Sequence, residues 1–145
     1  MKKEENPFGK NIATLLQNQE TEISLAKTAL DIGCAYGANA YYLASLGINV
    51  DAIDKLLPAT PPNPLIKFQK CDILNFSFEK KYDIILAFNI LQFLSKDDKY
   101  AVLKRIAKSL TANGLLFIQS FSEKDPSFGK SINIKSHFAK KELLN

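Results

Sequence analysis

Short apolar runs alternate with helix-like segments along most of this chain, and that alternation constrains the fold more than any other feature. Three segments have apolar residues at helical spacing: a short one at 11–19, then 38–46, and a longer one that begins at Ser95. Five runs have the length and composition of strands: 29–32, 49–53, 66–69, 82–88 and 115–120. Strands and helices in this order predict an α/β fold, a doubly wound and mostly parallel sheet with helices on both faces.

Local signals predict where the helices begin and end. Gly47 is placed to cap the carboxyl end of the first helix. Ser95 is placed as the N-cap of the second helix, and residues 113–114 (Asn-Gly) are expected to end it. The face of this helix that is expected to be buried contains Tyr100, Leu103, Ile106, Ala107 and Leu110. Four prolines between residues 58 and 64 exclude a regular helix between the second and third strands.

The 145 residues are enough for a single domain, which we assign to residues 11–145, with a short amphipathic helix at 11–19. Residues 1–10 are polar and are expected to form a flexible segment or a lid. The apolar runs fall far short of the roughly 20 residues that cross a bilayer. No membrane span and a cytoplasmic location are therefore expected. A net charge of +4, spread along the chain, makes a nucleic-acid partner unlikely.

A glycine-bearing loop, Gly33–Gly37, follows the first strand. In doubly wound sheets, ligands bind beyond the carboxyl ends of the strands, and glycine lets the backbone approach them closely. The first amides of the helix that follows carry partial positive charge and favour an anionic group. Asp54 ends the second strand, 23 residues after Asp31, near the interval at which an acid binds a ribose diol. These features predict a nucleotide-like ligand.

Two nucleotide ligands are compatible with this loop. A dinucleotide would need small residues at Gly33, Ala35 and Ala38, but the second of these positions lacks the expected glycine, so an oxidoreductase domain remains the poorer fit. Asp31 suits a ligand that carries an ammonium group, and its charge would be unfavourable beside a pyrophosphate. S-adenosyl-L-methionine has an ammonium group, a carboxylate, a ribose and an adenine, and so matches every feature.

Several motifs in order resemble the class I, Rossmann-like S-adenosylmethionine-dependent methyltransferases, particularly the small tellurite-resistance-type branch. Residues 31–37 (Asp-Ile-Gly-Cys-Ala-Tyr-Gly) resemble the first-loop motif of that family. Residues 71–74 (Cys-Asp-Ile-Leu) resemble its acidic motif after the third strand, and residues 82–94 its fourth-strand motif. The likeness covers about residues 8–140.

The resemblance implies S-adenosyl-L-methionine as the cofactor. By this resemblance, the loop backbone holds the methionine part, Asp54 binds both ribose hydroxyls and Asp72 accepts from the adenine amino group. Ala35 replaces the usual second glycine, which is tolerable if its φ is negative. The residues expected to bind the cofactor are Asp31, Gly33, Cys34, Ala35, Gly37, Asn39, Asp54, Lys55, Leu56, Asp72, Ile73, Leu74, Phe88 and Asn89. Among them, Lys55 or Leu56 is expected against the adenine, and the pair 88–89 beside the sulfonium.

The family's sheet has seven strands, and this chain ends about where the last two would begin, so we expect five strands and an uncovered edge that a second copy or a partner would cover. The expected activity is methyl transfer to a small-molecule acceptor, by branch resemblance a soft nucleophile such as a thiol or a metalloid oxyanion. Neither Tyr36 nor His137 can be assigned as a catalytic residue, and a lone histidine offers no basis for a metal site. The alternative is an inactive S-adenosylmethionine-binding module that acts through a protein partner.

Overall fold

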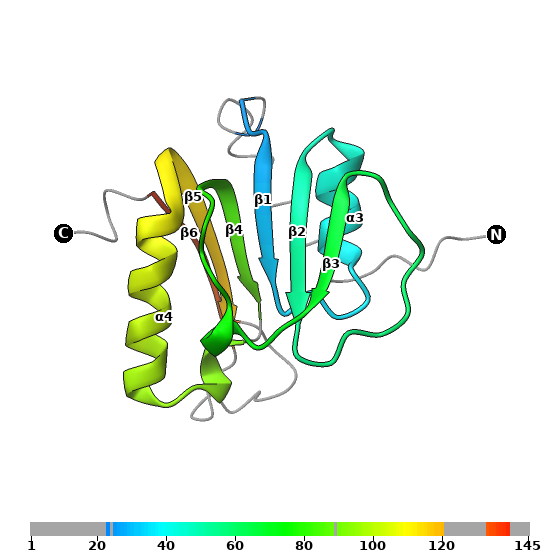
Figure 1. Cartoon of the computed structure of the whole chain (residues 1–145). Coiled ribbons are helices and arrows are strands. Elements are labelled where there is room, and N and C mark those ends of the chain that lie inside the picture. Colours follow the sequence, from blue (N-terminus) through cyan, green and yellow to red (C-terminus); the bar gives the residue numbers. More distant parts are fainter. Residues whose placement is uncertain (1–22, 24, 89, 121–132, 140–145) are drawn as a thin grey trace.

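The computed structural model describes residues 23, 25–88, 90–120 and 133–139. Within these residues, six strands form one sheet in the order β3-β2-β1-β4-β5-β6 (Figure 1). The first five pair in parallel, and β6 runs antiparallel to β5. The strands are β1 (Thr28–Ile32), β2 (Asn49–Asp54), β3 (Ile66–Lys70), β4 (Tyr82–Phe88), β5 (Leu110–Ser120) and β6 (Asn133–Ala139). The predicted doubly wound parallel sheet is confirmed, because the chain leaves β1 toward β2 on one side and returns to β4 on the other.

Two helices lie on opposite faces of the sheet, α3 (Ala38–Ser45) and α4 (Lys96–Ser109). Gly47 follows α3 with a φ of +84°, and its N–H donates to the carbonyl of Ala44, as predicted for a capping glycine. Ser95 caps α4, since its Oγ accepts the N–H of Asp98 at 3.1 Å. Two short 3₁₀ turns, η1 (Ile73–Asn75) and η2 (Leu91–Phe93), follow β3 and β4. Among the described helices, none is long and apolar enough to cross a membrane.

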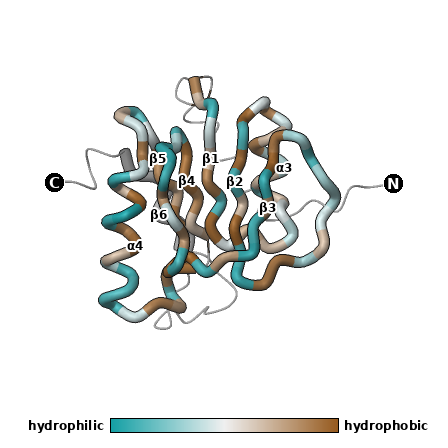
Figure 2. The backbone as a smooth tube through the Cα atoms, viewed as in Figure 1, coloured by the Kyte–Doolittle hydropathy of each residue, from teal (hydrophilic) through white to brown (hydrophobic). Residues whose placement is uncertain are grey.

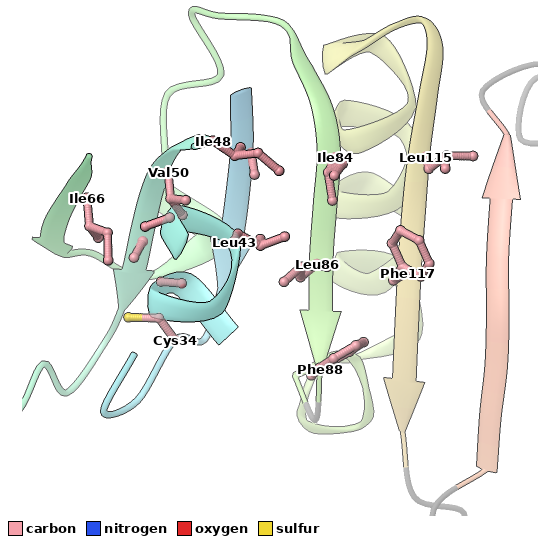
Figure 3. Close-up of a cluster of buried hydrophobic side chains, with 14 residues drawn as sticks. Cys34, Leu43, Ile48, Val50, Ile66, Ile84, Leu86, Phe88, Leu115 and Phe117 are labelled. Atoms are coloured by element: carbon pink, nitrogen blue, oxygen red, sulfur yellow. The ribbon is translucent and has the colours of Figure 1, made fainter. Parts of the chain in front are cut away.

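Both faces of the sheet are buried because successive side chains of a strand point to opposite sides. On the α3 face, Leu43 packs with Val50, Leu86 and Phe117 (Figure 3). The α4 face forms a second cluster around Ile106. Apolar residues accordingly concentrate along the central strands in Figure 2. The two clusters fix the register of the parallel strands, and therefore the positions of the loops at their carboxyl ends.

The end of α4 differs from the prediction. The helix stops at Ser109, and Leu110 is already extended and opens β5, so residues 113–114 do not end the helix. Leu110 pairs with Tyr82, and an irregularity in the register then pairs Leu115 with Ile84. The buried face is also shifted, because Val102 is buried whereas Tyr100 is 69% exposed. Tertiary packing against the sheet selects the side of the helix that is buried.

The strand β6 corrects a second expectation. The sequence after residue 121 carries no apolar run, and we expected five strands with β5 at an uncovered edge. Residues 133–139 instead pair with β5 from Leu115↔Ala139 to Ser120↔Asn133. An outer strand can be held by backbone hydrogen bonds alone and does not need an apolar pattern. The predicted helix at 11–19 and the predicted lid at 1–10 lie outside the described residues.

The connection between β2 and β3 has neither helix nor strand, as its prolines predicted. The hydroxyl of Tyr41 donates to the carbonyl of Pro61 and so ties this connection to α3. The five parallel strands all end at one edge of the sheet, the lower edge in Figure 1. The loops after β1, β2, β3 and β4 therefore share that edge.

Candidate functional site

The Gly33–Gly37 loop between β1 and α3 turns through left-handed backbone at three positions. Gly33 has a φ of +75° and Gly37 of +84°. The condition under which alanine would be tolerable at position 35, a negative φ, is not met, because the φ of Ala35 is +47°. A left-handed residue with a Cβ costs roughly 1–2 kcal/mol. The amide N–H of Ala35 donates to Oδ2 of Asp54 at 2.8 Å, and a bond to a charged acceptor can offset that cost.

The same loop is fastened to β2 by its backbone. The N–H groups of Gly33 and Cys34 both donate to the carbonyl of Ile53, at 2.8 and 3.0 Å. The N–H of Gly37 donates to the carbonyl of Cys34 and closes the turn. Burial, reinforced by the charges of Asp31 and Asp54, raises the pKa of the Cys34 thiol to about 12. Cys34 therefore contributes a neutral side chain and a fixed backbone.

Asp54 stands at the carboxyl end of β2 and faces the loop. Its Oδ2 accepts from Ala35, and its Oδ1 accepts the N–H of Leu56 at 2.9 Å. An ionised carboxylate offers about four acceptor positions, so two such bonds leave room for further donors. The side chain is thus held in place by backbone and remains able to bind a pair of hydroxyl groups.

Asp31, at the carboxyl end of β1, is a buried carboxyl group with an unsatisfied oxygen. The residue is 1% exposed, and within the described part of the chain its Oδ2 has no hydrogen-bond partner. Burial, together with the negative charge of Asp54, raises the pKa of Asp31 from 3.8 to about 7. Asn39, on the first turn of α3, likewise buries an amide oxygen that has no hydrogen-bond partner among the described residues. Such groups are costly to leave unpaired, and a ligand cation or donor would satisfy them.

A cavity of about 400 Å³ opens at this edge of the sheet. Six of the residues expected to bind a cofactor line it: Gly33, Asp54, Lys55, Asp72, Ile73 and Leu74. Eight lining residues were not predicted as binding residues. Three of them, Ile32, Ile53 and Cys71, lie at the ends of β1, β2 and β3, and the other five are Ile90, Phe93, Leu94, Ser95 and Asp98. These five lie between the end of β4 and the first turn of α4. The sequence could have indicated them, because the loop after a predicted strand lies at the edge where ligands bind. The volume suits a small-molecule ligand.

Lys55 and Leu56 do not face the same space, although either was expected to contact the adenine. Lys55 lines the 400 Å³ cavity, whereas Leu56 lines a more open hollow of about 550 Å³ together with Ala35, Tyr36 and Lys70. Asp54 borders both hollows. Its carboxylate therefore lies at the junction between the two spaces.

The side chain of Asp72 fixes the conformation of the acidic segment that follows β3. Oδ1 of Asp72 accepts the N–H of Leu74 at 3.0 Å and caps η1, and Nζ of Lys55 lies 3.8 Å from the other oxygen. The N–H of Cys71 donates to the carbonyl of Asp54, which joins the ends of β2 and β3. Ile73 is buried behind this segment. The wall of the cavity thus consists of a capped turn with one ion pair at its surface.

The loop after β4 reaches the first loop through Ile90. A Cβ built on Gly33 would lie 2.3 Å from Cδ1 of Ile90, so any other residue at this position would require the Ile90 side chain to move. Phe88 is buried in the α3-face cluster and does not line the cavity (Figure 3). Asn89 lies outside the described residues. In the part of the chain that is described, no group of three or more His, Cys, Asp or Glu side chains could hold a metal ion.

Comparison with known proteins identifies the family. Residues 30–118, from β1 through most of β5, match the family model described as "Methyltransferase domain". The chain belongs to this methyltransferase family. The matched residues of the methyltransferase domain include the glycine loop, Asp54, Asp72 and all of α4, which are the elements that surround the cavity.

Individual relatives are similar over most of this methyltransferase domain. It is 32% identical to a putative methyltransferase of Invertebrate iridescent virus 6 over 107 residues, which are 68% of this chain and 39% of the viral protein. Among solved structures, it superposes with a TM-score of 0.66 on the 1,6-didemethyltoxoflavin-N1-methyltransferase of Burkholderia thailandensis, at 20% identity, covering 88% of this chain and 56% of that one. TehB of Haemophilus influenzae gives a TM-score of 0.59 at 21% identity, covering 75% of this chain and 40% of TehB. The chain spans less than half the length of the curated relatives it matches.

Proposed function

We propose that this methyltransferase domain binds S-adenosyl-L-methionine at the carboxyl edge of its sheet and transfers the methyl group to a small-molecule acceptor. The observation that carries the proposal is the carboxylate of Asp54, fixed by two backbone N–H groups at the mouth of the Gly33–Gly37 loop, beside a cavity of about 400 Å³. This is the position that a ribose diol requires next to a backbone that a ligand can approach.

The residues around Asp54 fit the remaining parts of the cofactor. The unpartnered oxygen of Asp31 suits the ammonium group of the methionine part. The first amides of α3 have no side-chain cap and suit its carboxylate. The cavity wall formed by Asp72, Ile73 and Leu74 suits the adenine, with an acceptor for its amino group and apolar atoms for its ring. One chain therefore offers a complementary group to each end of the molecule.

When bound, S-adenosylmethionine supplies a methyl group on a positively charged sulfur, which is already activated for displacement. The chain's contribution is then to hold the acceptor in line and to exclude water. A soft nucleophile needs no dedicated base. A thiol or metalloid-oxyanion acceptor is proposed from the resemblance of the chain's motifs to the tellurite-resistance-type branch. A cytoplasmic location is supported by the free thiols of Cys34 and Cys71.

Calorimetric titration with S-adenosylmethionine, followed by a transfer assay on small thiols and metalloid oxyanions, tests the proposal. Binding with turnover supports it. Binding without turnover on any acceptor would instead support the inactive module. Absence of binding would refute both, and tighter binding of a nicotinamide dinucleotide would favour the oxidoreductase alternative.

A further inference from the structure

Arg105 reaches from α4 to the segment that follows η1. Its Nη1 donates to the carbonyl of Leu74 at 3.4 Å, and its Nη2 donates to the carbonyl of Phe76. The guanidinium carbon lies 4.8 Å from the centre of the Phe78 ring. One planar side chain therefore contacts three positions of the connection between β3 and β4.

This connection forms one wall of the cavity, and the buried side chains of Ile73 and Phe76 anchor it in the core. Leu74 lines the cavity, and its N–H is held by Asp72 while its carbonyl is held by Arg105. Phe76 is buried, and its ring meets that of Phe78 edge to face at 5.0 Å between centroids. Asp72 and Arg105 therefore each hold one backbone group of Leu74, in addition to the anchoring of the wall by buried Ile73 and Phe76.

The chemistry of the contact explains why an arginine stands there. A guanidinium group presents several N–H donors in one plane and can stack on an aromatic ring at the same time. A lysine at this position could reach one carbonyl as a point charge, but it could not bridge two carbonyls and stack on the ring. Ser95, the N-cap of α4, and Asp98, on its first turn, also line the cavity. The helix that carries Arg105 therefore contributes to the lining of the cavity at its amino end as well.

We propose that Arg105 is a positioning residue that fixes the wall formed by residues 72–74 and thereby sets the preference of the site for adenine. The inference rests on the proposed function, since adenine is assigned to this wall. Arg105 does not line the cavity and acts through the carbonyls of Leu74 and Phe76. A purely structural role would lower stability without changing which base is preferred.

The test compares S-adenosylhomocysteine with S-inosylhomocysteine, in which a carbonyl replaces the adenine amino group, by calorimetry on the full chain. For Arg105→Met we expect about tenfold weaker binding of the adenosyl compound, equivalent to about 1.4 kcal/mol, and less than about threefold weaker binding of the inosyl compound. Lys108→Met is the matched control, because Lys108 is exposed on the last turn of the same helix. It should leave both affinities unchanged.

A second variant keeps the inference testable if Arg105→Met fails to fold. Arg105→Lys retains the charge. It should also weaken binding of the adenosyl compound more than binding of the inosyl compound, but by a smaller factor than Arg105→Met. Equal weakening of both compounds in a folded variant, or no weakening of either, would overturn the inference while leaving the proposed function intact. If the unmodified chain binds neither compound, the proposed function fails as well.

Discussion

The amide N–H of Ala35 and the carboxylate of Asp54 are 2.8 Å apart, and this bond joins the loop after β1 to the end of β2. This one bond affects both the conformation of the loop and the orientation of the Asp54 carboxylate. The bond holds Ala35 in a left-handed conformation, with a φ of +47°, and it orients the carboxylate toward the loop. The shape of the loop and the placement of the acid therefore depend on each other.

Replacement of Ala35 by glycine should raise the free energy of unfolding by about 0.5–1 kcal/mol. Glycine removes the left-handed strain of roughly 1–2 kcal/mol, while part of the gain is lost to the greater freedom of glycine in the unfolded chain. Urea denaturation measures the change. Ala101→Gly, at an exposed position within α4, is the control and should lower stability by about 1 kcal/mol. A loss of similar size at both positions would show that Ala35 is not strained.

Gly33→Ala and Gly47→Ala separate steric conflict from backbone strain. Both glycines have positive φ, +75° and +84°. A Cβ on Gly47 meets nothing within 4 Å, whereas a Cβ on Gly33 meets Ile90 at 2.3 Å. We expect Gly47→Ala to cost about 1–2 kcal/mol and Gly33→Ala about 1–3 kcal/mol more, by denaturant unfolding. Equal losses would show that the Ile90 side chain moves away from the added Cβ without a measurable cost.

The stability of the ligand-free protein should fall as pH rises from about 4 to about 7. Burial raises the pKa of Asp31 from 3.8 to about 7, so in this window the folded state keeps a proton that the unfolded state has released. The free energy of unfolding then decreases by up to about 1.4 kcal/mol per pH unit from this group, and the effect levels off above about pH 7. Asp31→Asn should remove this part of the pH dependence. Identical unfolding profiles for the two proteins would exclude Asp31 as its source.

The affinity for S-adenosylhomocysteine should change with pH in the opposite direction. An ionised Asp31 attracts the ammonium group of the ligand, whereas a protonated one does not, so binding should strengthen between pH 5.5 and pH 8. Calorimetry at both pH values measures the effect. Asp31→Asn should bind more weakly at pH 8 and show little dependence on pH. An equally steep dependence in this variant would assign the titration to another group.

The central strands β1 and β4 could be predicted because their apolar runs are buried on both faces, and the Ser95 cap because its signal is local. Asp54 could be predicted because it directly ends a strand at the edge where ligands bind. Contacts between distant residues could not be predicted in the same way. The left-handed Ala35 depends on a hydrogen bond across 19 positions, Arg105 acts on a loop 29 to 31 residues earlier, and β6 is held to β5 by backbone pairing.

The most direct test of the proposed site is the affinity of Asp54→Ala for S-adenosylhomocysteine, measured by calorimetry at pH 8 beside the unmodified chain and Asp97→Ala. Asp97 is an exposed acid on the first turn of α4 and serves as the matched control. We predict that the unmodified chain and Asp97→Ala bind alike, and that Asp54→Ala binds more weakly by about 1–3 kcal/mol because the ribose hydroxyls lose a charged acceptor. Equal affinity of all three proteins, or no binding by the unmodified chain, would contradict the account.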